Sequence, residues 1–188
     1  MNTGIMSEQP EVRVGRLLTA AHLTIAAAES CTGGLLTSRL TDVAGSSAYV
    51  KGSVVSYTNE VKAALLGVEE ELLKTLGAVS EPVARAMAEG VRRRMRTDIG
   101  VGITGLAGPG GGTPEKPVGL VFVSVAGAQG TDVRRFLFSG DRRAIKGQAA
   151  EAALTMMEEY LMKGPSHGTV SRCFSQAVRL HPLFRKPC

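Results

Sequence analysis

The segment that most constrains the fold is a short apolar run that ends in a glycine-containing turn. Residues 23–28, LTIAAA, are almost wholly apolar, and a run this short is typical of a buried strand rather than of a whole helix. The run stops at residues 29–34, ESCTGG. Beyond the turn, apolar side chains recur at helical spacing as far as Gly45: Leu35, Leu36, Leu40 and Val43. A strand, a tight turn and a helix in direct succession favour an α/β fold.

The rest of the chain alternates between strand-like and helix-like patterns. Strands are expected at 23–28, 49–57, 98–104, 118–126 and 133–138, and helices at 10–21, 35–44, 59–66, 69–76, 80–95 and 141–161. The last two strands are close enough in sequence to pair antiparallel. These elements predict a three-layer α/β/α sandwich with a mixed five-stranded sheet.

Two helix starts carry residues that commonly cap a helix. Asn59 is expected to cap the helix at 59–66, and Ser80, followed by Pro82, is expected to cap the helix at 80–95. On the first of these helices, the spacing of apolar residues predicts a buried stripe formed by Val61, Ala64 and Leu65.

Length and charge indicate one domain with a different tail. The chain has 188 residues, enough for one core, and we expect a domain over 1–163. Residues 164–188 are polar and without periodicity, which predicts a poorly ordered extension. The tail contains four Lys or Arg residues and no acidic residue, so it carries +4 of the formal charge of +5, and the body is nearly neutral. With aromatic residues at 4% and no Trp, this charge distribution disfavours a nucleic-acid partner.

The three cysteines, Cys31, Cys173 and Cys188, fit neither a disulfide framework nor a zinc site. We therefore expect a reducing compartment and no metal. No apolar run approaches the ~20 residues that span a bilayer, and residues 1–13 lack the pattern of a secretory signal. The sequence predicts a cytoplasmic protein without a membrane partner.

Ser30 and Lys62 are the first candidates for chemistry. Ser30 follows the buried strand at a helix start, where N–H groups and the helix dipole favour an oxyanion or phosphate. The alternative is that Ser30 or Thr32 merely caps the helix. No histidine is well placed as a base for Ser30, but Lys62 lies within a turn of a strand end and can act if its surroundings lower its pKa. The alternative for Lys62 is an ordinary solvated helix lysine.

Three further features leave alternatives open. The glycines between Gly105 and Gly112 form either an anion-binding loop or a plain flexible loop, and their spacing matches no known phosphate fingerprint. Arg142, Arg143 and Lys146, at the start of the last helix, either hold a phosphate or form surface charge. Cys31 is a lesser rival to Ser30 as nucleophile, since no nearby histidine could form the usual thiolate pair.

Several motif blocks together resemble one family, the C-terminal domain of the competence/damage-inducible CinA proteins and its stand-alone form, nicotinamide-nucleotide amidase. The resemblance spans about residues 11–163. It rests on AESCTGGL (28–35), AGSS (44–47), VSYTNEVK (55–62), GAVSEPV (77–83), TGLAGPGGG (104–112), KPVG (116–119) and FSGDR (138–142).

The resemblance implies a fold, a reaction and a set of site residues. The fold is a three-layer α/β/α domain with a mixed five-stranded sheet, and the reaction converts nicotinamide mononucleotide and water to nicotinate mononucleotide and ammonia. Ser30 is then the nucleophile and Lys62 the base. Ser47 and Tyr57 supply supporting hydroxyls, and Tyr57 is counted among the catalytic residues. The expected substrate contacts are Thr32, Gly33, Ser47, Thr104, Gly105 and Arg142.

The same resemblance implies no cofactor, a small-molecule nucleotide as substrate, and a homo-oligomer. Such an amidase needs a neutral lysine, so the pKa of Lys62 must lie well below its usual ~10.4. The rival hypothesis is a catalytically silent nucleotide-binding regulatory module, which would have no need of a nucleophile and base. A DNA-associated role is disfavoured by the near-neutral body.

Overall fold

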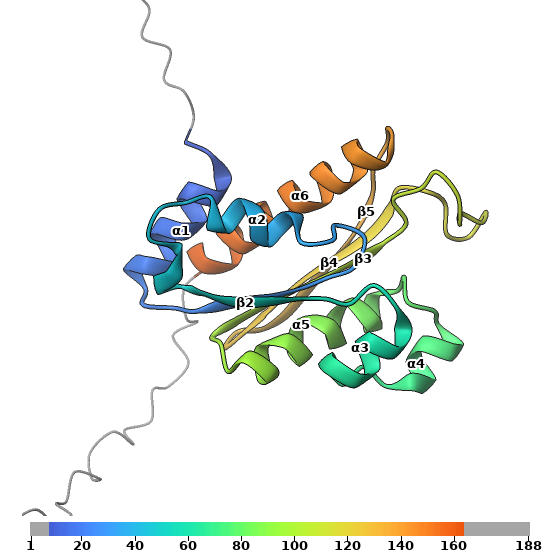
Figure 1. Cartoon of the computed structure of the whole chain (residues 1–188), viewed down its shortest axis with the longest axis horizontal. Helices are drawn as coiled ribbons and strands as arrows, with labels where there is room; N and C mark the ends of the chain where they lie inside the picture. Colours follow the sequence, from blue (N-terminus) through green and yellow to red (C-terminus); the bar gives the residue numbers. More distant parts are fainter. Residues whose placement is uncertain (1–7, 164–188) are drawn as a thin grey trace, which may run out of the picture.

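The computed structural model of the chain describes residues 8–163. Residues 1–7 and the predicted tail, 164–188, lie outside the described part. Five strands form one sheet in the order β2-β1-β3-β4-β5 (Figure 1). They are β1 (Ile25–Glu29), β2 (Val50–Val55), β3 (Ile99–Gly105), β4 (Leu120–Gly127) and β5 (Gly130–Leu137). The strand β1 runs parallel to both β2 and β3, whereas β4 is antiparallel to β3 and to β5, so the predicted mixed sheet is confirmed.

Helices cover both faces of this sheet (Figure 1). One face carries α1 (Pro10–Ala20), α2 (Leu35–Thr41) and α6 (Arg142–Met162), and the other carries α3 (Asn59–Leu66), α4 (Glu70–Thr75) and α5 (Glu81–Met95). A short 3-10 turn, Ser46–Ala48, precedes β2. The three-layer sandwich is thus confirmed. None of the helices in the described part is long and apolar enough to cross a membrane.

The interior strand β1 is buried on both faces, which explains its continuous apolar sequence. Ile25 and Ala27 pack in the cluster beneath α1, α2 and α6, whereas Ala26 and Ala28 pack in the cluster beneath α3 and α5. The two helical layers are therefore held against opposite sides of the strand that ends directly before Ser30.

Close backbone packing fixes α3 on α5. A Cβ atom added at Gly90 of α5 would lie 2.0 Å from the carbonyl oxygen of Leu66, so only glycine allows this approach. The same helix packs on β3 at Gly100, where an added Cβ would lie 2.1 Å from the carbonyl oxygen of Ala88. Since α3 carries Lys62, these contacts set the position of that lysine relative to the sheet.

Two local predictions are wrong, and a third, that Ser80 caps α5, is confirmed for the N-cap position only. The N-cap of α3 is Thr58, whose Oγ1 accepts a hydrogen bond from the N–H of Val61, and Asn59 is already helical. The buried side chains of α3 are Lys62 and Leu66, while the predicted stripe residues Ala64 and Leu65 are exposed. The helix turns its lysine rather than its apolar stripe toward the sheet. Ser80 occupies the N-cap position of α5 but donates its hydroxyl to the carbonyl of Gly77 instead.

Candidate active site

Ser30 and Lys62 meet at the carboxyl end of the parallel strands. Ser30 directly follows β1, and Lys62 lies on α3, which follows the neighbouring strand β2. The Nζ atom of Lys62 lies 3.1 Å from Ser30 Oγ and donates a hydrogen bond of 2.6 Å to the carbonyl oxygen of Ser56. Lys62 is only 1% exposed and Ser30 8%. The interpretation of Lys62 as a solvated helix lysine is therefore wrong.

Burial controls the protonation of this lysine. None of the ion pairs in the described part of the chain includes Lys62, so its amine faces a hydroxyl and a carbonyl but no carboxylate. Burial without a compensating negative charge lowers the pKa of Lys62 below its ordinary value. The geometry thus provides a hydroxyl beside an amine that gives up its proton more readily than an exposed lysine does.

The turn after Ser30 is organised by Glu29, a residue that the sequence analysis did not select. Its carboxylate is fully buried and accepts four hydrogen bonds: from the N–H groups of Gly34, Leu36 and Thr37, and from the hydroxyl of Thr37. Glutamate at the end of an apolar strand, directly before the candidate nucleophile, was the signal that could have identified it.

This network decides what the start of α2 can do. The N-cap position is Gly34, and neither Ser30 nor Thr32 caps the helix, so that alternative is wrong. The N–H groups of Gly34, Leu36 and Thr37 already donate to Glu29. They are therefore not available to a bound oxyanion or phosphate, contrary to the expectation from the sequence. The N–H of Gly33 donates to the carbonyl of Ser30.

A cavity of about 300 Å³ opens beside the Ser30–Lys62 pair. Among the predicted site residues it brings together Ser30, Tyr57, Lys62, Thr104, Gly105 and Arg142. Its remaining wall is formed by Cys31, Ala78, Val79 and by residues of the glycine loop, so this loop belongs to the cavity. Ala78 and Val79 belong to the motif block at 77–83 but were not among the predicted site residues, and they reach the cavity from the connection between α4 and α5.

Two polar side chains shape the walls of this cavity. Arg142 donates one hydrogen bond to the hydroxyl of Tyr57 (2.9 Å) and one to the carbonyl of Gly108 (2.6 Å), and so links the segment after β2 to the glycine loop. Thr104 donates its hydroxyl to the carbonyl of Ala78. Arg142 therefore holds the exposed ring of Tyr57 beside the cavity.

Three of the predicted site residues lie outside the cavity lining. Ser47 is exposed in the turn that precedes β2, at the opposite end of that strand from Tyr57. Thr32 is fully buried, and its hydroxyl has no hydrogen-bond partner in the described part of the chain. Gly33 is exposed on the outer side of the turn.

Cys31 lines the cavity, but its electrostatic surroundings oppose thiolate formation. Burial raises the pKa of Cys31 to about 11, and the positive charges of Lys62 and Lys146 only partly oppose this effect. The thiolate is the nucleophilic form of cysteine, so this environment favours Ser30 over Cys31 as nucleophile. Within residues 8–163, no three His, Cys, Asp or Glu side chains come together in a group able to hold a metal ion.

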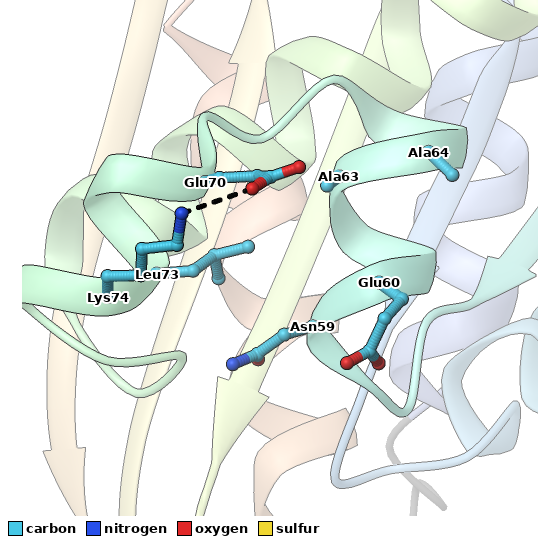
Figure 2. A pocket seen from close by; sticks show the side chains of 7 residues that line it. All are labelled: Asn59, Glu60, Ala63, Ala64, Glu70, Leu73 and Lys74. Atoms are coloured by element: carbon cyan, nitrogen blue, oxygen red, sulfur yellow. Dashed lines mark hydrogen bonds and ion pairs between the residues drawn. The ribbon is translucent and has the colours of Figure 1, made fainter.

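A larger cavity, of about 570 Å³, lies between α3 and α4 (Figure 2). Figure 2 shows Ala63, Ala64 and Leu73 at this cavity together with Asn59, Glu60, and the Glu70–Lys74 ion pair. None of the predicted site residues lines it. Lys62 belongs instead to the cavity at the end of β1.

The family model of the CinA C-terminal domain matches residues 7–161 of the chain. A CinA-like protein from Syntrophus aciditrophicus is 52% identical over 158 residues, which make up 84% of this chain and 38% of that protein. A CinA-like protein from Gemmatimonas aurantiaca is 58% identical over 132 residues, 70% of this chain and 31% of that protein. The chain thus spans about a third of the length of these relatives.

Solved structures show the same fold. A CinA superfamily protein from Klebsiella pneumoniae superposes with a TM-score of 0.79 at 33% identity, covering 83% of this chain and 99% of that one. The competence/damage inducible protein CihA from Agrobacterium tumefaciens superposes with a TM-score of 0.78 at 39% identity, covering 85% of this chain and 99% of that one. Sequence, fold and family model agree, and the chain belongs to the CinA C-terminal domain family.

Proposed function

We propose that the chain is an amidohydrolase that converts nicotinamide mononucleotide and water to nicotinate mononucleotide and ammonia. The observation that carries this proposal is the buried amine of Lys62, which lies 3.1 Å from the hydroxyl of Ser30 at the edge of a cavity. A binding module without turnover has no use for such a pair. Burying a lysine without a carboxylate costs stability, so its retention is best explained by chemistry.

The pair supplies the proton transfers that amide hydrolysis needs. Ser30 Oγ attacks the carboxamide carbon while its proton moves to the neutral amine of Lys62. The lysine then gives this proton to the departing nitrogen, and the C–N bond breaks. Ammonia departs, and the acyl group remains attached to Ser30 as an ester. Water attacks this ester while the same amine takes one of its protons, and the lysine returns that proton to Ser30 Oγ as the ester bond breaks. The carboxylic acid loses its proton to the solvent, so the product leaves as a carboxylate and the Ser30 hydroxyl and neutral lysine are restored.

The oxyanion formed in each attack needs hydrogen-bond donors. The N–H groups of Cys31 and Thr32 directly follow the nucleophile and donate no backbone hydrogen bond within the described residues. We assign them this role in the proposed mechanism. Tyr57 acts mainly through Arg142, since its hydroxyl accepts the hydrogen bond that fixes the guanidinium beside the cavity.

The comparisons support the family, while the reaction rests on the pair and on the motif blocks that carry it. The relatives are named as CinA-like or competence/damage inducible proteins, and these names give no substrate. The near-neutral body and the size of the cavity, about 300 Å³, fit a small molecule better than a nucleic acid.

The test is a direct assay with nicotinamide mononucleotide in which ammonia and nicotinate mononucleotide are both measured. We expect equal amounts of the two products from the wild type and none from Ser30→Ala. Ser38→Ala is the matched control, because Ser38 is an exposed serine on α2 that forms no side-chain hydrogen bond in the described structure. Absence of both products from the folded wild type would disprove the proposal.

A further inference from the structure

The cavity of about 570 Å³ between α3 and α4 forms a groove, the α3–α4 groove, with an apolar lining (Figure 2). Ala63 and Ala64 contribute to this lining from α3 and Leu73 from α4. Ala64 is exposed, and its neighbour Leu65 is 40% exposed. Both belong to the stripe that the sequence predicted to be buried, so this stripe lies on a surface that no segment of residues 8–163 covers. An amphipathic pattern without a partner in the described fold favours a binding segment from elsewhere.

Carboxylates surround the apolar lining. Glu60 of α3 and Glu70 of α4 line the groove, and Glu69 and Glu71 flank Glu70 in the sequence. Glu60, Glu69 and Glu71 take part in none of the ion pairs of the described part of the chain, and the pair between Glu70 and Lys74 is exposed. The exposed charged groups from α3 through α4 are thus four carboxylates and one ammonium group, a net charge of −3. The groove therefore attracts a segment that is both basic and apolar.

The chain itself contains a segment of this chemistry. Residues 179–186, RLHPLFRK, hold three large apolar side chains and three cations, and no acidic residue. They belong to the 25 residues that follow Lys163, which carry a formal charge of +4. Such a segment can bind in a groove through its charges and a few apolar contacts, without a core of its own.

Residues 164–178 are a long enough connection between the end of α6 and the groove. These fifteen residues span about 50 Å when extended, whereas a compact domain of this size is roughly 40 Å across. The segment can therefore reach the groove of its own molecule.

A second apolar cleft, of about 470 Å³, lies beside the end of α6. Leu23, Tyr160 and Leu161 contribute to its lining. Its single carboxylate, Asp98, already accepts two hydrogen bonds from Thr24, so this cleft offers no unpartnered carboxylate to a basic segment. Charge complementarity therefore favours the α3–α4 groove.

We propose that residues 179–186 dock in the α3–α4 groove of their own chain, with their apolar side chains against Ala64 and Leu73 and their cations beside Glu60 and Glu70. The docked segment covers the outer side of α3, the helix that buries Lys62 on its inner side, and restrains that helix. The inference does not depend on the proposed amide hydrolysis, because docking needs no substrate.

Hydrogen–deuterium exchange of the full chain, measured by mass spectrometry, tests the docking. Arg179→Glu/Arg185→Glu/Lys186→Glu reverses the charges of the segment, and Arg172→Glu is the control, because it reverses a cation that lies outside the segment. We expect the amides of residues 59–74 to exchange about threefold more slowly, or slower still, in the wild type and the control than in the triple variant. In about 0.5 M sodium chloride this difference should shrink, because salt screens the attraction.

Reversing the charges of the groove gives a second, independent measurement. Glu60→Lys/Glu70→Lys should also lose the slow exchange, and combining it with the triple variant should restore it, since the two surfaces again carry opposite charges. Restoration would show that loss of docking, and not misfolding, causes the faster exchange.

Three outcomes would overturn the inference. One is equal exchange of residues 59–74 in the wild type and the triple variant, and another is a difference confined to the cleft beside Tyr160. The third is a difference that appears only at high protein concentration, since the segment would then bind a second copy of the chain.

Discussion

Replacing Glu29 with glutamine should destabilise the protein far more than a change of one atom suggests. Oε2 accepts from the N–H groups of Gly34 and Leu36, and Oε1 accepts from the N–H and the hydroxyl of Thr37. The amide of glutamine replaces one acceptor by a donor. The least costly orientation puts its NH2 group toward Thr37, whose hydroxyl can turn and accept, but the N–H of Thr37 then faces another donor.

The magnitude follows from counting these bonds. One buried N–H loses its acceptor, at a cost of about 1–3 kcal/mol, and the two remaining backbone bonds lose their charge assistance, at roughly 0.5 kcal/mol each. The sum is about 2–4 kcal/mol, or a decrease in melting temperature of roughly 4–16 °C for a domain of this size. Because the same network holds the turn after Ser30, kcat for amide hydrolysis should also fall by about tenfold or more.

Thermal unfolding followed by circular dichroism measures the first effect, and the ammonia assay measures the second. Glu71→Gln is the control, since Glu71 is exposed on α4 and its carboxylate forms no hydrogen bond in the described structure. Its melting temperature should stay within about 2 °C of the wild type. If Glu29→Gln melts as this control does, the carboxylate network does not stabilise the turn and the reasoning fails.

Five further outcomes are expected. Ser30→Ala should lose deamidation while the fold is retained, and turnover near that of the wild type would remove Ser30 as nucleophile. The pKa of Lys62 is lowered by burial and only the neutral amine accepts a proton, so kcat should rise with pH through that lowered pKa. Lys62→Arg should be inactive at every pH, and a rate within about tenfold of the wild type would exclude lysine as base. Gly90→Ala places a Cβ 2.0 Å from the carbonyl oxygen of Leu66 and should cost about 1–3 kcal/mol or more in unfolding free energy, with lower kcat as α3 shifts. Gly147→Ala, whose Cβ meets nothing within 4 Å in helix α6, should instead be neutral or stabilising by up to about 1 kcal/mol, and equal melting temperatures for these two variants would contradict the packing argument.

The succession of strands and helices could be predicted from the sequence because it is written in local patterns. The apolar run before Ser30, the four-residue steps of Val83, Met87 and Val91, and the paired strands β4 and β5 each need only their own neighbours to be recognised. The strand-end position of Ser30 follows from the same patterns, and so does the helix start at Asp141, whose side chain caps α6.

What the tertiary structure decided is the environment of each polar side chain. The helical periodicity of α3 predicted that Ala64 and Leu65 face the core, but packing against α5 and the sheet buries Lys62 instead. This burial lowers the pKa of the Lys62 amine. In the sequence, Glu29 is a single charged residue at the end of a strand. Only in the folded chain do the N–H groups at the start of α2 donate to its carboxylate. Arg142 forms its hydrogen bond with Tyr57 although the two residues are 85 positions apart in the sequence. Ser47, by contrast, lies at the far end of β2 from Tyr57 although their motif blocks are neighbours in the sequence. Local sequence determines the helices and strands because propensity and periodicity act over a few residues. The desolvation and hydrogen bonding of a polar side chain depend instead on which helices pack on which part of the sheet, and only the folded chain brings these together.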